Sequence, residues 1–217
     1  MKTLIIDTSG TYTTIALVHD DELIAYQTLL AQPLVNLHEL IRQLTHNAGW
    51  ELSVLDRIAV VTGPGSWTGL NIGVTAAKTL AQVLDIALVE LSTLDILAAA
   101  QPWTENGLCA LIDAKRDNVY HAFYRVAAGR PDLAASQPAL VPFSDLLGAL
   151  ETGVLVVEYG NVFCERVATE RTDITVISYD SLPNRGLLLA LQTAEGEGLR
   201  GDEILGVMPV YMQKLVR

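Results

Sequence analysis

A glycine-rich stretch at residues 63–73, Gly-Pro-Gly-Ser-Trp-Thr-Gly-Leu-Asn-Ile-Gly, carries residue types that could bind an anion. It follows the apolar run 58–61 and leads into an Ala-rich segment of helical length. This order predicts a buried strand that turns into a helix, with hydroxyl and backbone N–H groups near the helix N-terminus. Such a turn is a common place for the recognition of a phosphate or a partner.

Two functions fit this stretch: an anion or nucleotide cradle, or a tight connection in which Trp67 packs against a neighbouring surface. Known phosphate loops fit poorly, because Leu70 follows Gly69 where a P-loop has lysine, and the glycine spacing departs from the dinucleotide fingerprint. Pro64 stands where a nucleophile elbow needs glycine, so Ser66 is expected to serve the turn. The candidate cofactor-binding residues are Asp7, Gly63, Gly65, Ser66, Thr68 and Gly69.

Asp7 ends a short buried-strand signal, and a turn leads from it into a second strand. The same order returns at Asp113, which precedes a turn and the strand 118–124. A strand, an aspartate, a turn and a strand in both halves are typical of a duplicated fold. Each aspartate could hold a hydrated cation or a phosphate, or be an ordinary turn residue. The basic pair 115–116 could be an anion clamp, but a charged turn is favoured.

Composition narrows the classes of function. The chain has 25 acidic and 14 basic residues among 217, and this net charge of −11 disfavours direct nucleic-acid binding.

The cysteines and histidines give no sign of a metal site. Cys109 and Cys164 form no C-x-x-C pair, so they are predicted to be reduced core thiols, and the histidines lack metal-binding spacing. No apolar run could span a membrane and Asp7 interrupts the apolar start, so we expect a cytoplasmic protein without membrane contact.

The hydrophobic periodicity predicts strands and helices in both halves. The first half is expected to open with three antiparallel strands, followed by a helix at 33–48, a strand at 58–61, a helix at 69–84, a strand at 86–91 and a helix capped by Ser92. After a linker at 101–107, we expect strands at 110–113, 118–124, 154–157 and 174–177, helices at 144–150, 160–169 and 184–193, and an extended segment from Pro209.

The helix at 69–84 is apolar almost all round, and small residues recur on one of its faces. This seam of Gly73, Ala77 and Ala81 would let another helix approach closely. Helices 33–48 and 69–84 are therefore expected to form a docking surface.

Several motifs lie in order along nearly the whole chain: Leu4–Ser9, the stretch 63–73, Leu91–Leu94, Ile112–Tyr120 and Pro209–Tyr211. Together they closely resemble the bacterial TsaB (YeaZ) family, and the stretch 63–73 is the most specific of them. The resemblance implies an α/β, actin-like fold of the sugar-kinase and heat-shock-ATPase type. It implies two domains, 1–102 and 103–217, each with a mixed sheet flanked by helices, and a last segment that packs back on the first domain.

The same resemblance implies a role in tRNA modification. The chain would be a non-catalytic subunit that supports a TsaD-like catalytic subunit, together with a TsaE-like ATPase, in transferring the threonylcarbamoyl group to the adenosine next to the anticodon. It would contact tRNA only indirectly and form homodimers. It would hold no cofactor of its own, and any ATP or ADP would be shared at the partner interface.

The chain departs from the family pattern at three positions: Asn36, where histidine is common, and Asn71 and Gln213, where arginine is common. These departures bear on partner contacts more than on the fold. An arginine at Ala77 is expected to prevent association with the TsaD-like partner. The expected interface residues are Asn36, Leu37, Leu40, Leu44, Gly73, Ala76, Ala77 and Leu80.

Two other functions stay open for this sequence. One is a small-molecule kinase or ATPase of the same fold, which would bind nucleotide by itself. Against it, the side chains of Lys115 and Arg116 would obstruct a phosphate beside Asp113, where actin-like ATPases have glycine-rich loops. The other is a stand-alone homodimeric binding module, which would show no partner-dependent activity.

Overall fold

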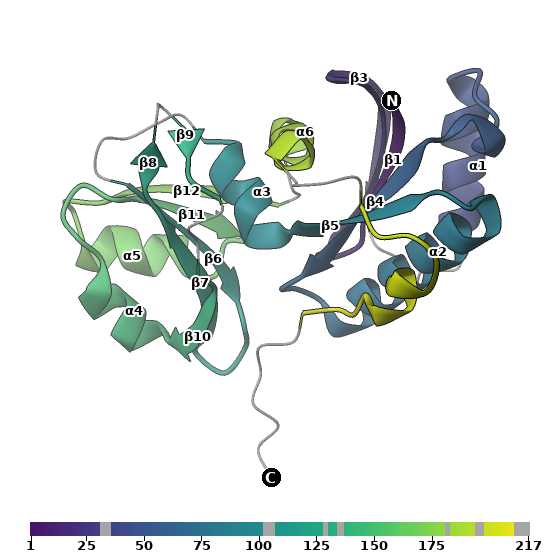
Figure 1. The fold of residues 1–217 in the computed structure, drawn as a ribbon. Helices are drawn as coiled ribbons and strands as arrows, with labels where there is room; N and C mark the ends of the chain where they lie inside the picture. Colours follow the sequence, from purple (N-terminus) through teal and green to yellow (C-terminus); the bar gives the residue numbers. More distant parts are fainter. Residues whose placement is uncertain are drawn as a thin grey trace, which may run out of the picture. The chain divides into compact units, whose positions relative to one another are not determined.

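The computed structural model describes residues 1–30, 36–101, 107–127, 130–133, 137–180, 183–193 and 198–210. Two compact units make up the chain: unit 1 comprises residues 1–93 and 188–210, and unit 2 comprises residues 94–187. Each unit contains a five-stranded sheet with helices packed on it (Figure 1). Within the described residues, no helix is both long enough and apolar enough to cross a membrane.

The unit 1 sheet has the strand order β3-β2-β1-β4-β5. The first three strands are antiparallel, as predicted, whereas β4 and β5 run parallel to β1. The inner strands β1 and β4 are buried along nearly their whole length, which explains their unbroken apolar runs, because helices or loops cover both faces of a central strand. The strands are β1 Lys2–Asp7, β2 Tyr12–His19, β3 Glu22–Leu30, β4 Arg57–Gly63 and β5 Ala87–Ser92.

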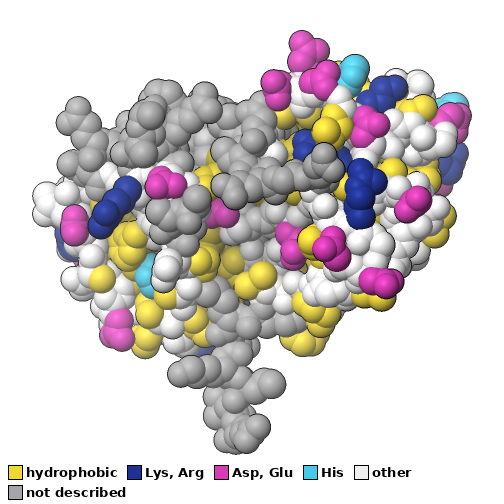
Figure 2. Space-filling model, in the orientation of Figure 1, with side chains coloured by type: hydrophobic (Ala, Val, Ile, Leu, Met, Phe, Trp, Pro, Cys, Tyr) yellow, Lys and Arg dark blue, Asp and Glu magenta, His cyan; other side chains and the backbone are white. Residues whose placement is uncertain are grey.

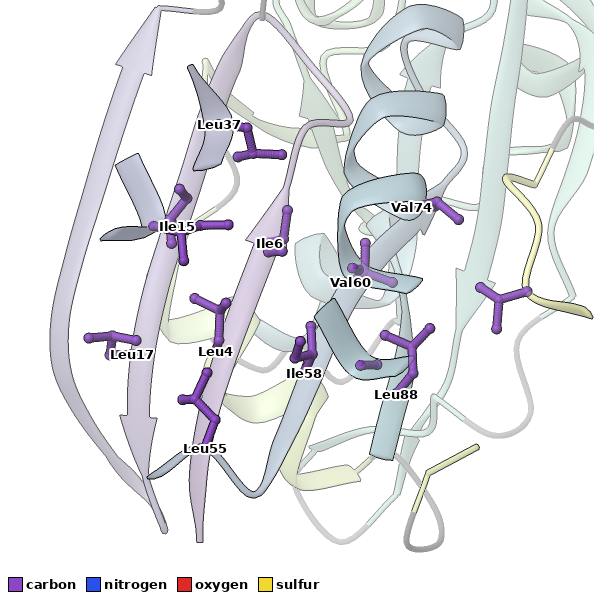
Figure 3. Close-up of a cluster of buried hydrophobic side chains, with 14 of the residues drawn as sticks. Leu4, Ile6, Ile15, Leu17, Leu37, Leu55, Ile58, Val60, Val74 and Leu88 are labelled. Carbon is purple, nitrogen blue, oxygen red and sulfur yellow. The ribbon is translucent and has the colours of Figure 1, made fainter. Parts of the chain in front are cut away.

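Helices α1 (Leu37–Asn47) and α2 (Trp67–Leu84) cover one face of this sheet. Figure 3 shows Leu37 of α1 and Val74 of α2 in the same apolar cluster as side chains from β1, β2, β4 and β5. α1 packs on β2 and β3, and α2 packs on β1, β4 and β5, so the two helices lie side by side across the sheet. Residues 33–35, where a helix start was predicted, lie outside the described residues. The short helix η1 (Leu52–Val54) precedes β4 in the chain. Helix α3 (Thr93–Ala99) follows β5, and its residues from Leu94 on belong to unit 2.

A returning segment, residues 199–210, packs on unit 1 beside α2 and contains the short helix η2 (Gly201–Gly206). Leu199 exchanges two backbone hydrogen bonds with Leu88 of β5, at 2.8 and 2.9 Å. The Lys78 Nζ of α2 donates to the carbonyl oxygens of Leu205 and Val207, at 2.8 and 2.9 Å. Lys78 therefore marks the side of α2 that faces the returning segment.

Unit 2 repeats the topology of unit 1, with the strand order β10-β7-β6-β11-β12. Again one strand pairs antiparallel with its hairpin partner on one side and parallel with the next strand on the other. Asp7 ends β1 and Asp113 ends β6, so the duplication predicted from these two aspartates is confirmed. The elements are β6 Leu108–Asp113, β7 Asn118–Tyr124, β8 Val126–Ala127, β9 Arg130–Pro131, β10 Ala139–Pro142, α4 Phe143–Ala149, β11 Leu155–Tyr159, α5 Cys164–Glu170 and β12 Thr175–Tyr179. Helix α6 (Asn184–Thr193) begins in unit 2, and its residues from 188 on belong to unit 1.

Helix α5 begins at Cys164 and not at Gly160, where the sequence pattern placed it. The cause is Glu158 of β11, a fully buried carboxylate that accepts hydrogen bonds from the backbone N–H groups of residues 162, 163 and 164 at 2.7–3.0 Å. These bonds satisfy the first N–H groups of the helix, and the negative charge faces the positive end of its dipole.

The two cysteines, Cys109 and Cys164, are both free and buried. Burial raises the pKa of both thiols, that of Cys164 to about 12.

Candidate functional site

The glycine-rich stretch joins β4 to α2 as predicted, and it packs against the turn that follows β1. Ser66 is the N-cap of α2, and its Oγ accepts a hydrogen bond from Gly69 N at 3.3 Å. Ser66 N donates to Ser9 O at 2.6 Å, and Thr8 Oγ1 donates to Gly69 O at 2.7 Å. Ser66 therefore serves the turn, as the sequence indicated, and ties it to the start of the helix.

Three glycines make this contact possible. A Cβ at Gly65 would lie 2.3 Å from Ser9 O, one at Gly69 would lie 1.9 Å from Thr8 O, and one at Gly73 would lie 2.1 Å from Thr8 Oγ1. These separations are far shorter than van der Waals contact, so only glycine lets the helix and the turn approach this closely. At these three glycines, the positions where a Cβ would stand thus face the chain's own turn.

Trp67 is the first residue of α2, and its side chain is 64 % exposed. The packing of Trp67 against a neighbouring surface stays a prediction. The hydrogen bonds of Ser66 and the close approach of the glycines already fix the connection. Thr68, another candidate for cofactor binding, is also exposed.

Asp7 is fully buried at the end of β1. Its Oδ1 accepts a hydrogen bond from Ser9 N at 2.8 Å, whereas its Oδ2 has no hydrogen-bond partner among the described residues. Burial raises the pKa of the Asp7 carboxyl from 3.8 to about 6, although the hydrogen bonds from Ser9 act to lower it. The bond to the N–H two residues on is that of a turn aspartate. Nowhere in the described part of the chain do three His, Cys, Asp or Glu side chains gather as a metal ion would require.

Asp113, the counterpart of Asp7 in unit 2, is paired within its own turn. Lys115 N donates to Asp113 Oδ1 at 2.7 Å, and Lys115 Nζ pairs with Oδ2 at 2.5 Å. Lys115, Arg116 and Asp117 all have left-handed backbone conformations, with φ of 67°, 55° and 60°. The Asn118 amide stabilises this turn by donating to Lys115 O and Arg116 O, at 3.3 and 2.9 Å. The Lys115 side chain, and not a glycine backbone, therefore lies beside Asp113. This is the charged turn that the sequence favoured.

The small-residue seam of α2 faces the core of unit 1. Ala77 and Ala81 are fully buried against the sheet, and Gly73 meets Thr8. The expectation that another helix packs on this seam is wrong, because the sheet and the β1–β2 turn already occupy it. An arginine at Ala77 would put a charge into the core, so it would disrupt the fold and not report on docking.

A different row of α2 residues is apolar and partly exposed, and we call it the α2 stripe: Ile72, Ala76, Leu80 and Val83. Val83 is 76 % exposed, and the other three are half-buried. They recur every three or four positions, so they share one side of the helix, opposite to Lys78. Since Lys78 faces the returning segment, the stripe lies on the side of α2 toward α1, where Leu40 is half-buried on the same core. Figure 2 shows hydrophobic side chains scattered among charged ones over the surface of unit 1.

The predicted interface residues fall into three groups. Leu37, Leu44, Gly73 and Ala77 are buried inside unit 1, Asn36 is exposed, and Leu40, Ala76 and Leu80 are half-buried. The last three pack on the same core as Ile72, and Val83 shares their side of α2; the sequence analysis singled out neither Ile72 nor Val83. Their spacing of three or four residues from Ala76 and Leu80 was the available signal. Gln213 lies outside the described residues. The role of these residues at a partner interface stays a prediction.

Comparisons with known proteins agree with this architecture. Residues 32–178 match the family model described as "TsaD: tRNA N6-adenosine threonylcarbamoyltransferase". A protein of Bacillus subtilis (strain 168), "tRNA threonylcarbamoyladenosine biosynthesis protein TsaB", is 38 % identical over 131 residues, which are 59 % of this chain and 57 % of that protein. The matched part therefore spans little more than half the length of that relative.

Solved structures extend the likeness to the whole chain. The structure "YeaZ from Pseudomonas aeruginosa" superposes with a TM-score of 0.76 at 26 % identity, covering 97 % of this chain and 99 % of that one. The "Activator of the 2-Hydroxyisocaproyl-CoA Dehydratase from Clostridium difficile with bound ADPNP" superposes with a TM-score of 0.54 at 11 % identity, over 89 % of this chain and 94 % of that one. The second likeness shows the fold alone, and with the duplicated sheets it confirms the actin-like fold class.

The contact between Thr8 and Gly73 can be tested by the stability of a Gly73 variant. Gly73→Ala is expected to lower the free energy of unfolding by about 2 kcal/mol, because the new methyl group overlaps Thr8 Oγ1. Adding Thr8→Ala should recover part of this loss by removing that atom. Gly69→Ala is the matched control, since its methyl group would meet the Thr8 backbone oxygen, which Thr8→Ala leaves in place. Urea denaturation measures all four variants, and an equal effect of Thr8→Ala in both backgrounds would contradict the contact.

The buried carboxyl of Asp7 makes a prediction about pH. Its pKa is about 6 in the folded chain and close to 3.8 when unfolded, so the folded chain loses stability as the pH rises between these values. The full loss is about 3 kcal/mol, and it is complete above pH ~6. Asp7→Asn should therefore raise stability more at pH 8 than at pH 4, whereas Asp202→Asn, at an exposed site, should not. Thermal unfolding at both pH values tests this, and a pH-independent effect of Asp7→Asn would contradict it.

Proposed function

The chain belongs to the TsaB (YeaZ) family of tRNA threonylcarbamoyladenosine biosynthesis proteins, and on that premise we propose that it binds and supports a TsaD-like catalytic subunit. The family acts in the threonylcarbamoyladenosine modification of tRNA. The proposed complex transfers the threonylcarbamoyl group to the adenosine next to the anticodon, with a TsaE-like ATPase as a further component in the cytoplasm. This chain acts there as a non-catalytic subunit.

The observation that carries this proposal is the α2 stripe. It is a continuous apolar row on a helix of 18 residues, the longest described helix of the chain. The helix is held rigidly on three sides, by the sheet, by the turn at Thr8 and by the bonds of Lys78 to the returning segment. A partly exposed apolar row on a fixed helix is a suitable docking surface, because little conformational entropy is lost when a partner covers it.

Three features support a non-catalytic role. The glycines that would form a phosphate cradle face Thr8 and Ser9. Asp113 is neutralised by Lys115, and a buried carboxylate of the chain itself, Glu158, occupies the start of α5. We therefore propose that the chain holds no nucleotide of its own and that any ATP or ADP lies at the interface with the partner. The net charge of −11 would repel the phosphate backbone of tRNA, so we propose that the partners of this chain, and not the chain itself, contact tRNA directly.

Docking is tested by charge on the α2 stripe. Val83→Arg and Ala76→Arg are expected to weaken binding to a cognate TsaD-like subunit at least ~10-fold, because an arginine would have to be desolvated inside an apolar interface. Gln82→Arg is the matched control, since Gln82 is an exposed neighbour on another side of the helix. Titration calorimetry measures the affinities, and equal binding by all three variants would contradict the docking surface. The same variants tested for tRNA modification in the reconstituted complex connect docking to activity.

The alternative function, a small-molecule kinase or ATPase, is tested by nucleotide binding. The isolated chain is expected to show no heat of binding with ATP and Mg²⁺ up to about 1 mM, the affinity range of typical substrates. Micromolar affinity accompanied by turnover would favour the enzyme. A complex that modifies tRNA equally well without this chain would leave the stand-alone homodimeric module.

A further inference from the structure

The returning segment carries a row of exposed apolar side chains. From Val207 to Val210 the burial alternates, with Val207 and Pro209 buried and the two residues after them, Met208 and Val210, exposed. This alternation is that of an extended segment laid on a surface, so Met208 and Val210 share its outer side. Met208 is 63 % exposed, and Leu205, which precedes it in η2, is 57 % exposed.

Helix α2 adds Trp67 to this surface. Trp67 precedes Lys78 by 11 residues, which is three helical turns and about 20°, so the two side chains lie on one side of α2. Lys78 Nζ donates to two carbonyl oxygens of the returning segment, and Val210 N donates to Thr62 O at 2.7 Å, near the end of β4 from which α2 begins. The returning segment therefore runs along this side of α2 toward its first turn. We call the exposed apolar residues here the second patch: Trp67, Leu205, Met208 and Val210.

A row of polar residues separates the second patch from the α2 stripe. The row consists of Thr68, Thr75, Thr79 and Gln82, which are all exposed and uncharged. Around the helix axis, Trp67 and Val83 lie about 160° apart, and the polar row lies between them. A partner that packs on one apolar row therefore leaves the other accessible.

Acidic side chains border the second patch beside η2. They are Glu90, Asp202 and Glu203, which are all exposed, and we call them the acidic border. Two of them belong to η2, as Leu205 does, and the charge of Lys78 reaches the third, Glu90. The basic side chains beside them are Lys78, whose ammonium group already bonds two carbonyls, and Arg200 at the start of η2. The border is therefore net negative.

The chemistry of the second patch selects among classes of partner. An acidic border repels the phosphates of nucleic acids and of anionic lipid head groups. Tryptophan and methionine are enriched in the cores of protein interfaces, where an aromatic ring supplies contact area and a thioether chain adapts to the partner's shape. A protein segment with lysine or arginine beside its apolar residues would cover the patch and place cations against the border.

We propose that the second patch docks a segment of a second protein partner, apolar on one side and flanked by lysine or arginine side chains that meet the acidic border. This partner is distinct from the TsaD-like subunit proposed for the α2 stripe, so neither docking depends on the other. Burial of Trp67 and Met208 supplies most of the affinity, and the charges at the exposed border set the specificity and the association rate.

The test uses a synthetic helical peptide of about 14 residues, with leucine along one side and lysine along the other. Titration calorimetry with the full chain is expected to give a Kd of about 100 μM. A peptide of the same pattern, with glutamate in place of lysine, is expected not to bind, because its charges meet the acidic border.

Substitutions at Met208 separate the apolar contact from the charge. Met208→Lys is expected to weaken binding of the lysine peptide at least ~10-fold, and Met208→Glu to weaken it less, since both remove the same apolar contact but only the lysine repels the peptide. Thr75→Lys is the matched control, because it makes the same change of charge in the polar row. Circular dichroism checks that each variant is folded, and hydrogen exchange of residues 205–210 locates the bound peptide.

Several results overturn the proposal: equal binding of the two peptides, an equal loss of affinity in Thr75→Lys and Met208→Lys, or no binding up to about 1 mM. So does a loss of affinity for the TsaD-like subunit in Met208→Lys, because the second patch would then belong to that interface. Self-association that Met208→Lys abolishes while the peptide still binds assigns the patch to a second copy and also overturns it.

Val83→Arg tells the two docking proposals apart. It is expected to weaken binding of the TsaD-like subunit and to leave the affinity for the lysine peptide within about 2-fold of that of the unchanged chain, since Val83 lies on the far side of the polar row. A Val83→Arg chain that loses the peptide as strongly as Met208→Lys does would contradict a separate second patch.

Discussion

Thr8, at the turn after β1, touches α2 at two successive glycines, and much of unit 1 depends on this contact. Its hydroxyl donates to Gly69 O at 2.7 Å and lies where a side chain at Gly73 would begin. A helix can come this close to a turn only along a face without Cβ atoms. The contact therefore fixes the rotation of α2 about its axis. Gly73, Ala77 and Ala81 must face inward, and Ile72, Ala76, Leu80 and Val83 are left on another side.

The rotation of α2 decides what each side of the helix can do. One side carries Lys78, whose ammonium group caps the carbonyls of Leu205 and Val207 and holds the returning segment. The side toward α1 carries the α2 stripe, whose side chains are all apolar and offer no hydrogen-bonding group to water. The α2 stripe is thus separate from the small residues of the same helix, which belong to the core.

The two units share a topology but differ in the chemistry of their turns. In unit 1 the turn after the aspartate is small and buried, and helix α2 packs against it. In unit 2 the turn is left-handed and charged, and Lys115 neutralises Asp113. Glu158 adds a second internal charge, held by the N–H groups at the start of α5. Asp113 and Glu158 thus each find partners within the chain itself.

Local sequence patterns were enough to predict the elements and their duplication. The apolar runs of β1, β4 and β6, each buried on both faces, and the aspartates that end β1 and β6 were enough to place two equivalent sheets, because strand burial and turn chemistry are local properties. The short edge strand β10 was not predicted, since it has no periodic pattern of its own. The family resemblance through the stretch 63–73 was likewise readable from order and residue type.

Only the tertiary structure decided which side of α2 is free. A helix that is apolar almost all round gives no preferred inward direction, so the small residues were assigned to a partner when they belong to the core. The late start of α5 likewise depends on a tertiary contact. Glu158 accepts hydrogen bonds from the N–H groups of residues 162–164, and no local pattern encodes such a contact.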